Sequence, residues 1–391
     1  MANTLKFGAG NWATKEGSTL AYNDENGNFK PLPFNFSRAS SATVINKDGL
    51  IETVGSGQPR IDYKDDSEGA LLLEPSRTNL ITYSEPISSE TGADGITYES
   101  FNWNLGFTNC IKFGDNSQTR YRYFTGTIAN STEYVISAFV IMDDLSEPVL
   151  GTASNNGDLI LRVGGTTATT GNLPNVNMGN NIYRVSSVIT SDVGGGTTGL
   201  LKYRYQSNKG FRIVGFQLEE GSYATSYIPT QGSAVTRLAD SCNNGGNEQV
   251  INSTEGTLYL ETATLLNTQT TDNSITLTDG GNNKIIFRYR NTNAFNVKVF
   301  VNGVAQAEAN HTLSNATDFN KIAVKWKLND YEIYVNGISV FTDSNALVFP
   351  NNSLNTLDLA DGTSFPLFGK VKDLKVYNTA LTDAELKALT T

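Results

Sequence analysis

The sequence has few of the residues that build metal centres, disulfide frameworks or nucleophilic triads. Its 391 residues include one histidine, His311, and two cysteines, Cys110 and Cys242. Two cysteines so far apart cannot form a disulfide framework. A lone histidine, without a second histidine or a neighbouring cysteine, is poor evidence for a metal ligand or a catalytic base. We therefore expect no cofactor, with the exception of a candidate structural calcium ion.

Positive charge and long apolar runs are also scarce. Lys and Arg number 29 against 39 Asp and Glu, which gives a formal net charge of −10. Nucleic-acid binding needs a basic face, so we expect no nucleic-acid partner. No run approaches the roughly 18–20 apolar residues that span a bilayer, so we expect no membrane insertion. The N-terminus also lacks the basic and apolar regions of a signal peptide, which predicts synthesis in the cytoplasm.

What the chain has in abundance is glycine, with 36 residues, and aromatic residues, with 19 Phe and 17 Tyr. Gly and Asn tolerate the positive φ angles of tight turns. The aromatic residues supply enough apolar surface for folded cores. This combination favours many short strands joined by turns.

The hydrophobic pattern predicts an all-β fold of tandem antiparallel β-sandwiches, or jelly rolls, with an extended N-terminal segment and one short C-terminal helix. Residues 134–141, 183–189 and 211–219 read as strands of a first sandwich, and a hairpin over residues 321–337 is the strongest strand signal of a second. Thr382 and Glu385 have the spacing of a capping box, which predicts a helix over residues 382–389. Trp326 is predicted to lie in the core.

The predicted division has three parts. Residues 1–97 form an attachment and oligomerisation segment, residues 98–240 a sandwich with a linker, and residues 241–391 a second sandwich. The first part has too little periodicity for a large core of its own. We expect it to wrap on itself or to pair with neighbouring subunits.

Two segments resemble known families. Residues 321–337 and 367–386, the latter reading Leu-Phe-Gly-Lys-Val-Lys-Asp-Leu-Lys-Val-Tyr-Asn-Thr-Ala-Leu-Thr-Asp-Ala-Glu-Leu, look like the C-terminal half of a concanavalin A-like, laminin-G-type lectin/glucanase domain. This resemblance covers roughly residues 248–391 and implies a jelly roll.

The second resemblance is to a module of bacteriophage fibre and virion proteins. It rests on Phe36-Ser37-Arg38, on Pro59-Arg60-Ile61-Asp62, on residues 71–80 (Leu-Leu-Leu-Glu-Pro-Ser-Arg-Thr-Asn-Leu) and on residues 216–230. In such proteins the intervening sandwich looks like a carbohydrate-binding module. The resemblance implies a structural or adhesive role on a virion.

Exposed aromatic rings can stack on sugars, while Arg and Asn orient the sugar hydroxyls. Most aromatic residues must nevertheless belong to cores or interfaces. The candidate ligand-binding residues are Trp103, Tyr121 and Tyr123 in the first sandwich, and Arg288, Tyr289 and Arg290 in the second.

Catalysis has little support in the sequence. A glycoside hydrolase needs two carboxylates facing each other across the sugar. The pairs Glu219-Glu220 and Asp143-Asp144 are adjacent, so in a strand they point to opposite faces. We therefore expect no catalytic residues and no enzymatic activity.

Acidic turns offer calcium ligands instead, although no loop has an EF-hand pattern. Asp272 and Asp279 belong to the wider set of candidates. Asp358 and Asp361, which flank a turn, are the candidate ligands we retain.

Together these features predict a phage virion surface protein, such as a fibre, spike or head decoration, that adheres weakly and multivalently to host surface glycans. We expect partners among other virion proteins, through the N-terminal segment, and a homo-oligomer, most simply a homotrimer. One alternative is a purely structural head or tail component. The other is a capsule-polysaccharide depolymerase, and the lack of two facing carboxylates in the sequence pattern argues against it.

Overall fold

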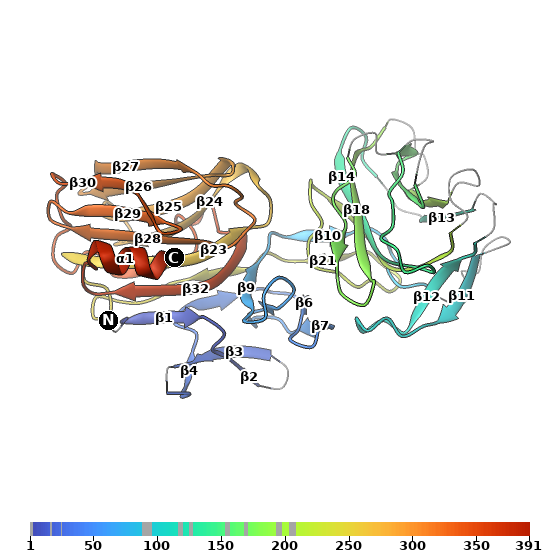
Figure 1. Ribbon diagram of the computed structural model, residues 1–391, viewed down its shortest axis with the longest axis horizontal. Helices are drawn as coiled ribbons and strands as arrows, with labels where there is room; N and C mark the ends of the chain where they lie inside the picture. The colour runs from blue at the N-terminus through green and yellow to red at the C-terminus, as the bar shows by residue number, and fades with distance from the viewer. Residues whose placement is uncertain are drawn as a thin grey trace. The chain divides into compact units, whose positions relative to one another are not determined.

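The computed structural model describes residues 3–15, 18–24, 26–87, 96–115, 120–124, 128–152, 157–167, 171–192, 198–202 and 209–391. The chain forms two compact units (Figure 1). Unit 1 consists of Met1–Ala39, Val54–Pro75 and Ala239–Thr391, and unit 2 of Ser40–Thr53 and Ser76–Leu238. The chain therefore passes from one unit to the other four times.

Unit 1 is a sandwich of two antiparallel sheets. In the described residues, an eight-stranded sheet has the order β30(Ile338–Asp343), β29(Tyr331–Val335), β28(Asn320–Lys327), β23(Glu255–Thr264), β32(Gly369–Tyr377), β9(Ala70–Leu73) and β8(Ile61–Asp62), with β1(Leu5–Gly8) also paired to β32. The five-stranded sheet has the order β27(Val304–Thr312), β26(Ala294–Val301), β25(Lys284–Thr292), β24(Thr268–Thr278) and β31(Thr356–Asp358).

Alternation along these strands builds the core of unit 1. On β25, Ile285, Phe287 and Tyr289 are buried between the sheets. Trp326 on β28 is fully buried in the same cluster, as predicted. Because side chains alternate along a strand, the residues between these core positions lie on the outer face of their sheet.

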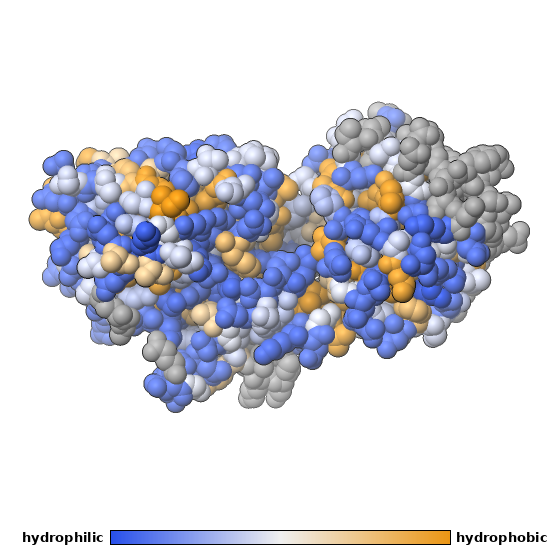
Figure 2. All heavy atoms as spheres, in the orientation of Figure 1, coloured by the Kyte–Doolittle hydropathy of each residue, from blue (hydrophilic) through white to orange (hydrophobic). Residues whose placement is uncertain are grey.

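The short helix α1(Asp383–Thr390) confirms the predicted C-terminal helix. The Thr382 side chain accepts a hydrogen bond from the Glu385 backbone, and the Glu385 carboxylate accepts one from the Thr382 backbone, which completes the capping box. Leu386 is buried with Tyr259 and Tyr334 on the outer face of the eight-stranded sheet, and α1 lies across that sheet (Figure 1). Figure 2 shows hydrophilic residues over most of this face, with hydrophobic ones scattered among them.

The N-terminal residues differ from their predicted grouping, because residues 1–97 are shared between both units. β1 and β9 each pair with β32, so strands from the start of the chain join the same sheet as the last strand of the chain. Two smaller sheets also belong to unit 1, formed by β2(Trp12–Lys15), β3(Ser18–Asn23) and β4(Phe29–Pro31), and by β5(Asn35–Ser37) and β22(Ser241–Asn243). This segment thus finds its strand partners within its own chain.

Unit 2 is also a layered β structure. In the described residues, a six-stranded sheet has the order β11(Ile96–Ser100), β12(Asn109–Phe113), β20(Phe211–Glu220), β14(Glu133–Met142), β18(Tyr183–Thr190) and β17(Val176–Asn177). A four-stranded sheet has the order β13(Arg120–Phe124), β19(Thr198–Lys202), β15(Ile160–Val163) and β16(Thr166–Thr167). Two short ribbons, β6(Ala42–Ile45) with β7(Ile51–Val54) and β10(Arg77–Asn79) with β21(Val235–Arg237), complete it. One core lies between β14 and β15, and a second covers the opposite face of the six-stranded sheet. The all-β fold with one short helix is confirmed for the described residues.

Candidate functional site

A hollow of about 340 Å³ lies on the outer face of the five-stranded sheet of unit 1. Its floor comes from alternate residues of β25, namely Lys284, Ile286 and Arg288, which point away from the core. Phe300 stands beside Lys284 on the neighbouring strand β26 and is half-buried. We call this site the β25 hollow, and its lining consists of Gly281, Asn282, Lys284, Ile286, Arg288, Phe300, Gly303 and Asp361.

Two adjoining turns form one wall of the β25 hollow. In the first, Asp279 accepts hydrogen bonds from the backbone N–H groups of Gly281 and Asn283. Although desolvation alone would raise it, the hydrogen bonds from Asn283 and Gly281 lower the pKa of Asp279. In the second turn, Asn302 has a φ of +50° and donates its N–H to the Asn283 side chain at 2.8 Å, while Gly303 donates to the Asn282 carbonyl at 2.8 Å. The two turns therefore hold each other in place.

Charged groups of both signs border the β25 hollow. The Lys284 ammonium lies 3.4 Å from the Asp361 carboxylate. Arg288 Nη1 lies 3.0 Å from Asp272, and Arg290 Nε lies 3.6 Å from the same carboxylate. One carboxylate thus serves two guanidinium groups.

Several buried polar atoms on this face have no hydrogen-bond partner in the described part of the chain. They are Ser274 Oγ, Thr276 Oγ1, Arg288 Nε and Asn296 Oδ1. Ser274 pairs with Arg288 across β24 and β25, and Asn296 pairs with Arg288 across β25 and β26, so the four atoms surround one strand. A buried polar atom without a partner costs about 1–3 kcal/mol. Such atoms point to a place where a ligand or ordered water completes the hydrogen bonding.

Two of the predicted site residues meet here. Arg288, predicted as a ligand-binding residue, and Asp361, predicted as a calcium ligand, line the same hollow. Arg290 lies further along β25 and is not part of the lining. The structure therefore brings part of the predicted set together, around a centre that the sequence did not identify.

Two predicted stacking residues were wrong. Trp103 is fully buried in unit 2 and packs edge-on against Phe101 and Phe107. Tyr289 is fully buried in unit 1, with its hydroxyl hydrogen-bonded to Thr262 at 2.7 Å. Neither ring has a face open to a ligand, because both point into a core.

Tyr121 and Tyr123 lie on β13, of which the structure describes the backbone at both positions. Their side chains fall outside the described residues. Their predicted stacking role therefore stays a prediction.

The candidate calcium ligands are each engaged by protein groups. Asp358 accepts a hydrogen bond of 2.7 Å from the Asn244 N–H, and Asp361 pairs with Lys284. Among the described residues, no group of three or more His, Cys, Asp or Glu side chains is placed to hold a metal ion. The calcium ion stays a prediction. In the same described ranges, no helix is both long and apolar enough to cross a membrane.

Sequence reasoning missed Phe300, Lys284 and Asn282. The alternation of Phe300 with Val299 and Val301, both buried, was the available signal for an outward ring. The approach of the turn at Asn282 to the turn at Gly303 had no signal, because it depends on the pairing of β25 with β26.

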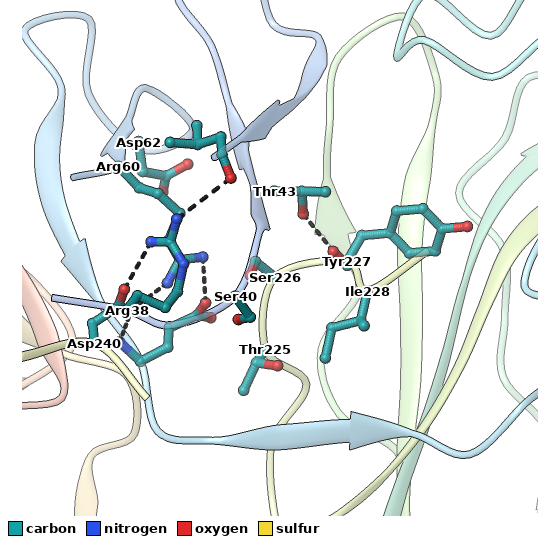
Figure 3. Close-up of polar contacts among 12 residues, drawn as sticks. Arg38, Ser40, Thr43, Arg60, Asp62, Thr225, Ser226, Tyr227, Ile228 and Asp240 are labelled. Carbon is teal, nitrogen blue, oxygen red and sulfur yellow. Dashed lines mark hydrogen bonds and ion pairs between the residues drawn. The ribbon is translucent and has the colours of Figure 1, made fainter. Parts of the chain in front are cut away.

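The motifs that resemble virion proteins form buried polar networks instead of an open site. In unit 1, Asp240 lies 3.0 Å from Arg38 Nη1, and its second oxygen contacts Arg60 Nη2 and the Glu74 N–H (Figure 3). Arg60 also pairs with Glu74 at 2.7 Å. These four side chains are nearly or fully buried, so the motif positions are explained by the fold.

Unit 2 uses the remaining motif residues in the same way. Asn79 donates to the carbonyls of Phe216 and Ile228 and accepts from the Leu218 N–H. The buried Glu219 carboxylate accepts hydrogen bonds from the Thr225 N–H and hydroxyl. In the same unit, Thr43 donates to the Tyr227 carbonyl (Figure 3).

Comparison with known families gives one match. Residues 227–387 match the model described as the concanavalin A-like lectin/glucanases superfamily. The C-terminal sandwich is therefore similar to concanavalin A-like domains, which supports the predicted lectin-like fold.

Solved structures that match part of this chain include the CBM40 of the Ruminococcus gnavus IT-sialidase, with 17% identity over 38% of this chain and 94% of that chain and a TM-score of 0.32. Domain 4 of AbnA, a GH43 extracellular arabinanase from Geobacillus stearothermophilus, has 14% identity over 44% and 83%, with a TM-score of 0.32. A SAP-like pentraxin from Limulus polyphemus has 13% identity over 36% and 71%, with a TM-score of 0.30. A search of curated proteins gave no match. None of these comparisons bears on a bacteriophage origin, which stays a prediction.

Proposed function

We propose that this protein binds glycans at the β25 hollow without cleaving them, as a surface component of a bacteriophage particle. The observation that carries the proposal is the combination, in a region similar to concanavalin A-like domains, of a half-buried aromatic ring with charged and amide side chains in the lining of one hollow. A sugar ring likewise combines apolar and polar groups, because its faces carry C–H groups and its rim carries hydroxyl groups.

The lining of the hollow has a group suited to each of these two kinds of surface. Phe300, which is half-buried, offers an apolar surface for the face of a sugar ring. Asn282, Lys284 and Asp361 offer donors and acceptors for its hydroxyl groups. The two interlocked turns hold the wall in place before a ligand binds, which lowers the entropic cost of binding.

The acids that line the hollow support binding without turnover. Hydrolysis needs two carboxylates roughly 5–9.5 Å apart on either side of the sugar. Asp361 is the one acid among the residues that line the hollow, and Lys284 pairs with it. This supports an adhesin over a capsule depolymerase.

The virion role rests on the sequence resemblance of residues 36–80 and 216–230. A fibre, spike or head decoration displays several copies, so a homotrimer would compensate for weak single sites. The second candidate is a purely structural head or tail component, and one observation favours it: the motif residues Arg38, Arg60 and Glu74 are buried in the fold.

Glycan-array screening of the full chain, followed by calorimetry on Phe300→Ala, separates these candidates. We expect an array hit whose affinity falls about tenfold or more in Phe300→Ala, where tenfold corresponds to about 1.4 kcal/mol. Phe29→Ala is the matched control, because Phe29 is an exposed ring on β4, outside the five-stranded sheet. A silent array would reject the proposal in favour of a purely structural role, and equal losses in both variants would reject the β25 hollow as the binding site. Release of reducing sugar would identify a depolymerase.

A further inference from the structure

The β25 hollow has more hydrogen-bond donors than acceptors. An ammonium group carries three donors, a guanidinium five and a carboxamide two, whereas Asp361 is the one carboxylate in the lining. Lys284 and Arg288 are therefore the main polar groups that a ligand meets.

Their protein partners leave much of this capacity unused. Lys284 is 3.4 Å from Asp361, which is a long contact for a charge-assisted hydrogen bond. Arg288 uses Nη1 for Asp272, and its Nε is buried without a hydrogen-bond partner in the described part of the chain. Asp272 is shared with Arg290. A further acceptor would therefore find donors of Lys284, and donors of Arg288 other than the buried Nε, already in place.

The charge of the lining also contrasts with that of the chain. The chain carries a formal net charge of −10, yet the lining has two cations, Lys284 and Arg288, against one anion. The two cations lie four residues apart on β25, which places their Cα atoms about 14 Å apart at the rise of a strand. Ile286 lies between them. This spacing suits a polymer with more than one acidic group.

We propose that the β25 hollow selects acidic polysaccharides, and that separate carboxylates of the polymer bind Lys284 and Arg288. This inference rests on the proposed glycan binding and names its ligand class. In the complex, a sugar carboxylate takes the place of Asp361 as the partner of Lys284. A second sugar carboxylate pairs with Arg288 through the guanidinium donors that the contact of Nη1 with Asp272 leaves unused.

The test compares acidic polysaccharides with their methyl esters, which keep the same backbone and lose the charge. Polygalacturonate, alginate and polysialic acid, each with its ester, are titrated into the full chain by calorimetry. We expect at least one acid to bind tenfold or more tightly than its ester, with a preference that shrinks as salt rises. Binding of neutral glycans and esters alone would overturn the inference and leave the proposed function standing. Binding of no glycan at all would reject both.

Three variants locate the effect. Lys284→Met and Arg288→Gln should each weaken binding of the acidic polymer about fivefold or more and weaken binding of its ester less. Asp361→Asn should strengthen acid binding, because it removes a like charge and releases Lys284. A loss of acid binding on Asp361→Asn would contradict the inference, since it would mean that the acidic polymer needs the Asp361 carboxylate as a hydrogen-bond acceptor.

Lys327→Met is the matched control for charge. Lys327 is an exposed lysine on β28, paired with Glu255 in the other sheet of unit 1. Its removal should leave acid binding unchanged. An equal loss in this variant would overturn the inference by showing that attraction to the polymer is spread over the surface.

Discussion

At the scale of single residues, the buried carboxylate of Asp240 joins two guanidinium groups from distant parts of the chain. It contacts Arg38 and Arg60 and accepts the Glu74 N–H. Removal of one partner from a buried ion pair leaves an uncompensated charge, at a cost of about 3–5 kcal/mol. The motif positions are therefore restricted by the stability of unit 1.

We predict that Asp240→Asn lowers the free energy of unfolding by about 3–5 kcal/mol, measured by urea denaturation. Asp144→Asn is the control, because Asp144 belongs to an exposed pair with Lys209. An unchanged urea midpoint in Asp240→Asn would show that the network adds nothing to stability.

Glu219 gives a prediction on pH. Desolvation raises the pKa of this buried carboxyl, against the opposing effect of the hydrogen bonds from Thr225. Because the pKa is higher in the folded state, its contribution to stability is fully present below the ordinary pKa and is lost as the pH rises through the folded value. In Glu219→Gln the amide oxygen can accept the Thr225 N–H and the amide nitrogen can donate to the Thr225 hydroxyl oxygen, and the side chain does not titrate. We predict that its melting temperature falls less than that of the wild type between pH 4 and pH 8. Parallel curves for the two proteins would contradict this.

Residue types alone predicted part of the site. Arg288 was identified because arginine beside an aromatic residue suits sugar hydroxyls, and Asp361 because an acidic turn suits calcium. Trp103 and Tyr289 were wrong because an aromatic residue does not reveal which face of a sheet it occupies. The alternation of Ile285, Phe287 and Tyr289 held that information, and it assigns Tyr289 to the core.

At the scale of elements, local signals were the most reliable. The capping box predicted α1, and the hairpin over residues 321–337 was confirmed as β28 and β29. Asn336 and Gly337, predicted to lie in the strand, instead form the turn into β30, where both have positive φ. Asn and Gly are the residues that such turns favour.

The helix α1 provides a graded test of packing against capping. Leu386→Ala should cost about 2–5 kcal/mol, because it opens a cavity under a fully buried side chain. Thr382→Ala should cost about 1 kcal/mol through the lost cap. Urea denaturation of both variants measures the difference. A larger loss in Thr382→Ala than in Leu386→Ala would mean that capping, and not docking, maintains the helix.

At the scale of the whole molecule, the sequence predicted two β-sandwiches but did not predict how the chain is divided between the two units. Leu5 pairs with Val376, and Leu73 pairs with Gly369. Short strands such as β1 and β9 carry too little pattern to specify a partner so distant in sequence. The four passages of the chain between the units were not predicted for the same reason.

The predicted oligomer also belongs to this scale. Weak sites gain from multivalent display, so we predict a trimer of the 42.3 kDa chain. Light scattering coupled to size-exclusion chromatography measures this mass directly. A monomer at micromolar concentration would limit the adhesin to the valency that a virion imposes.

A crystal structure of the full chain with the glycan selected on the array tests the central claim most directly. We predict a sugar ring over Phe300, with its polar groups within hydrogen-bond distance of Lys284, Arg288 or Asn282. A glycan bound on any other surface, with the β25 hollow empty, would contradict the proposed site.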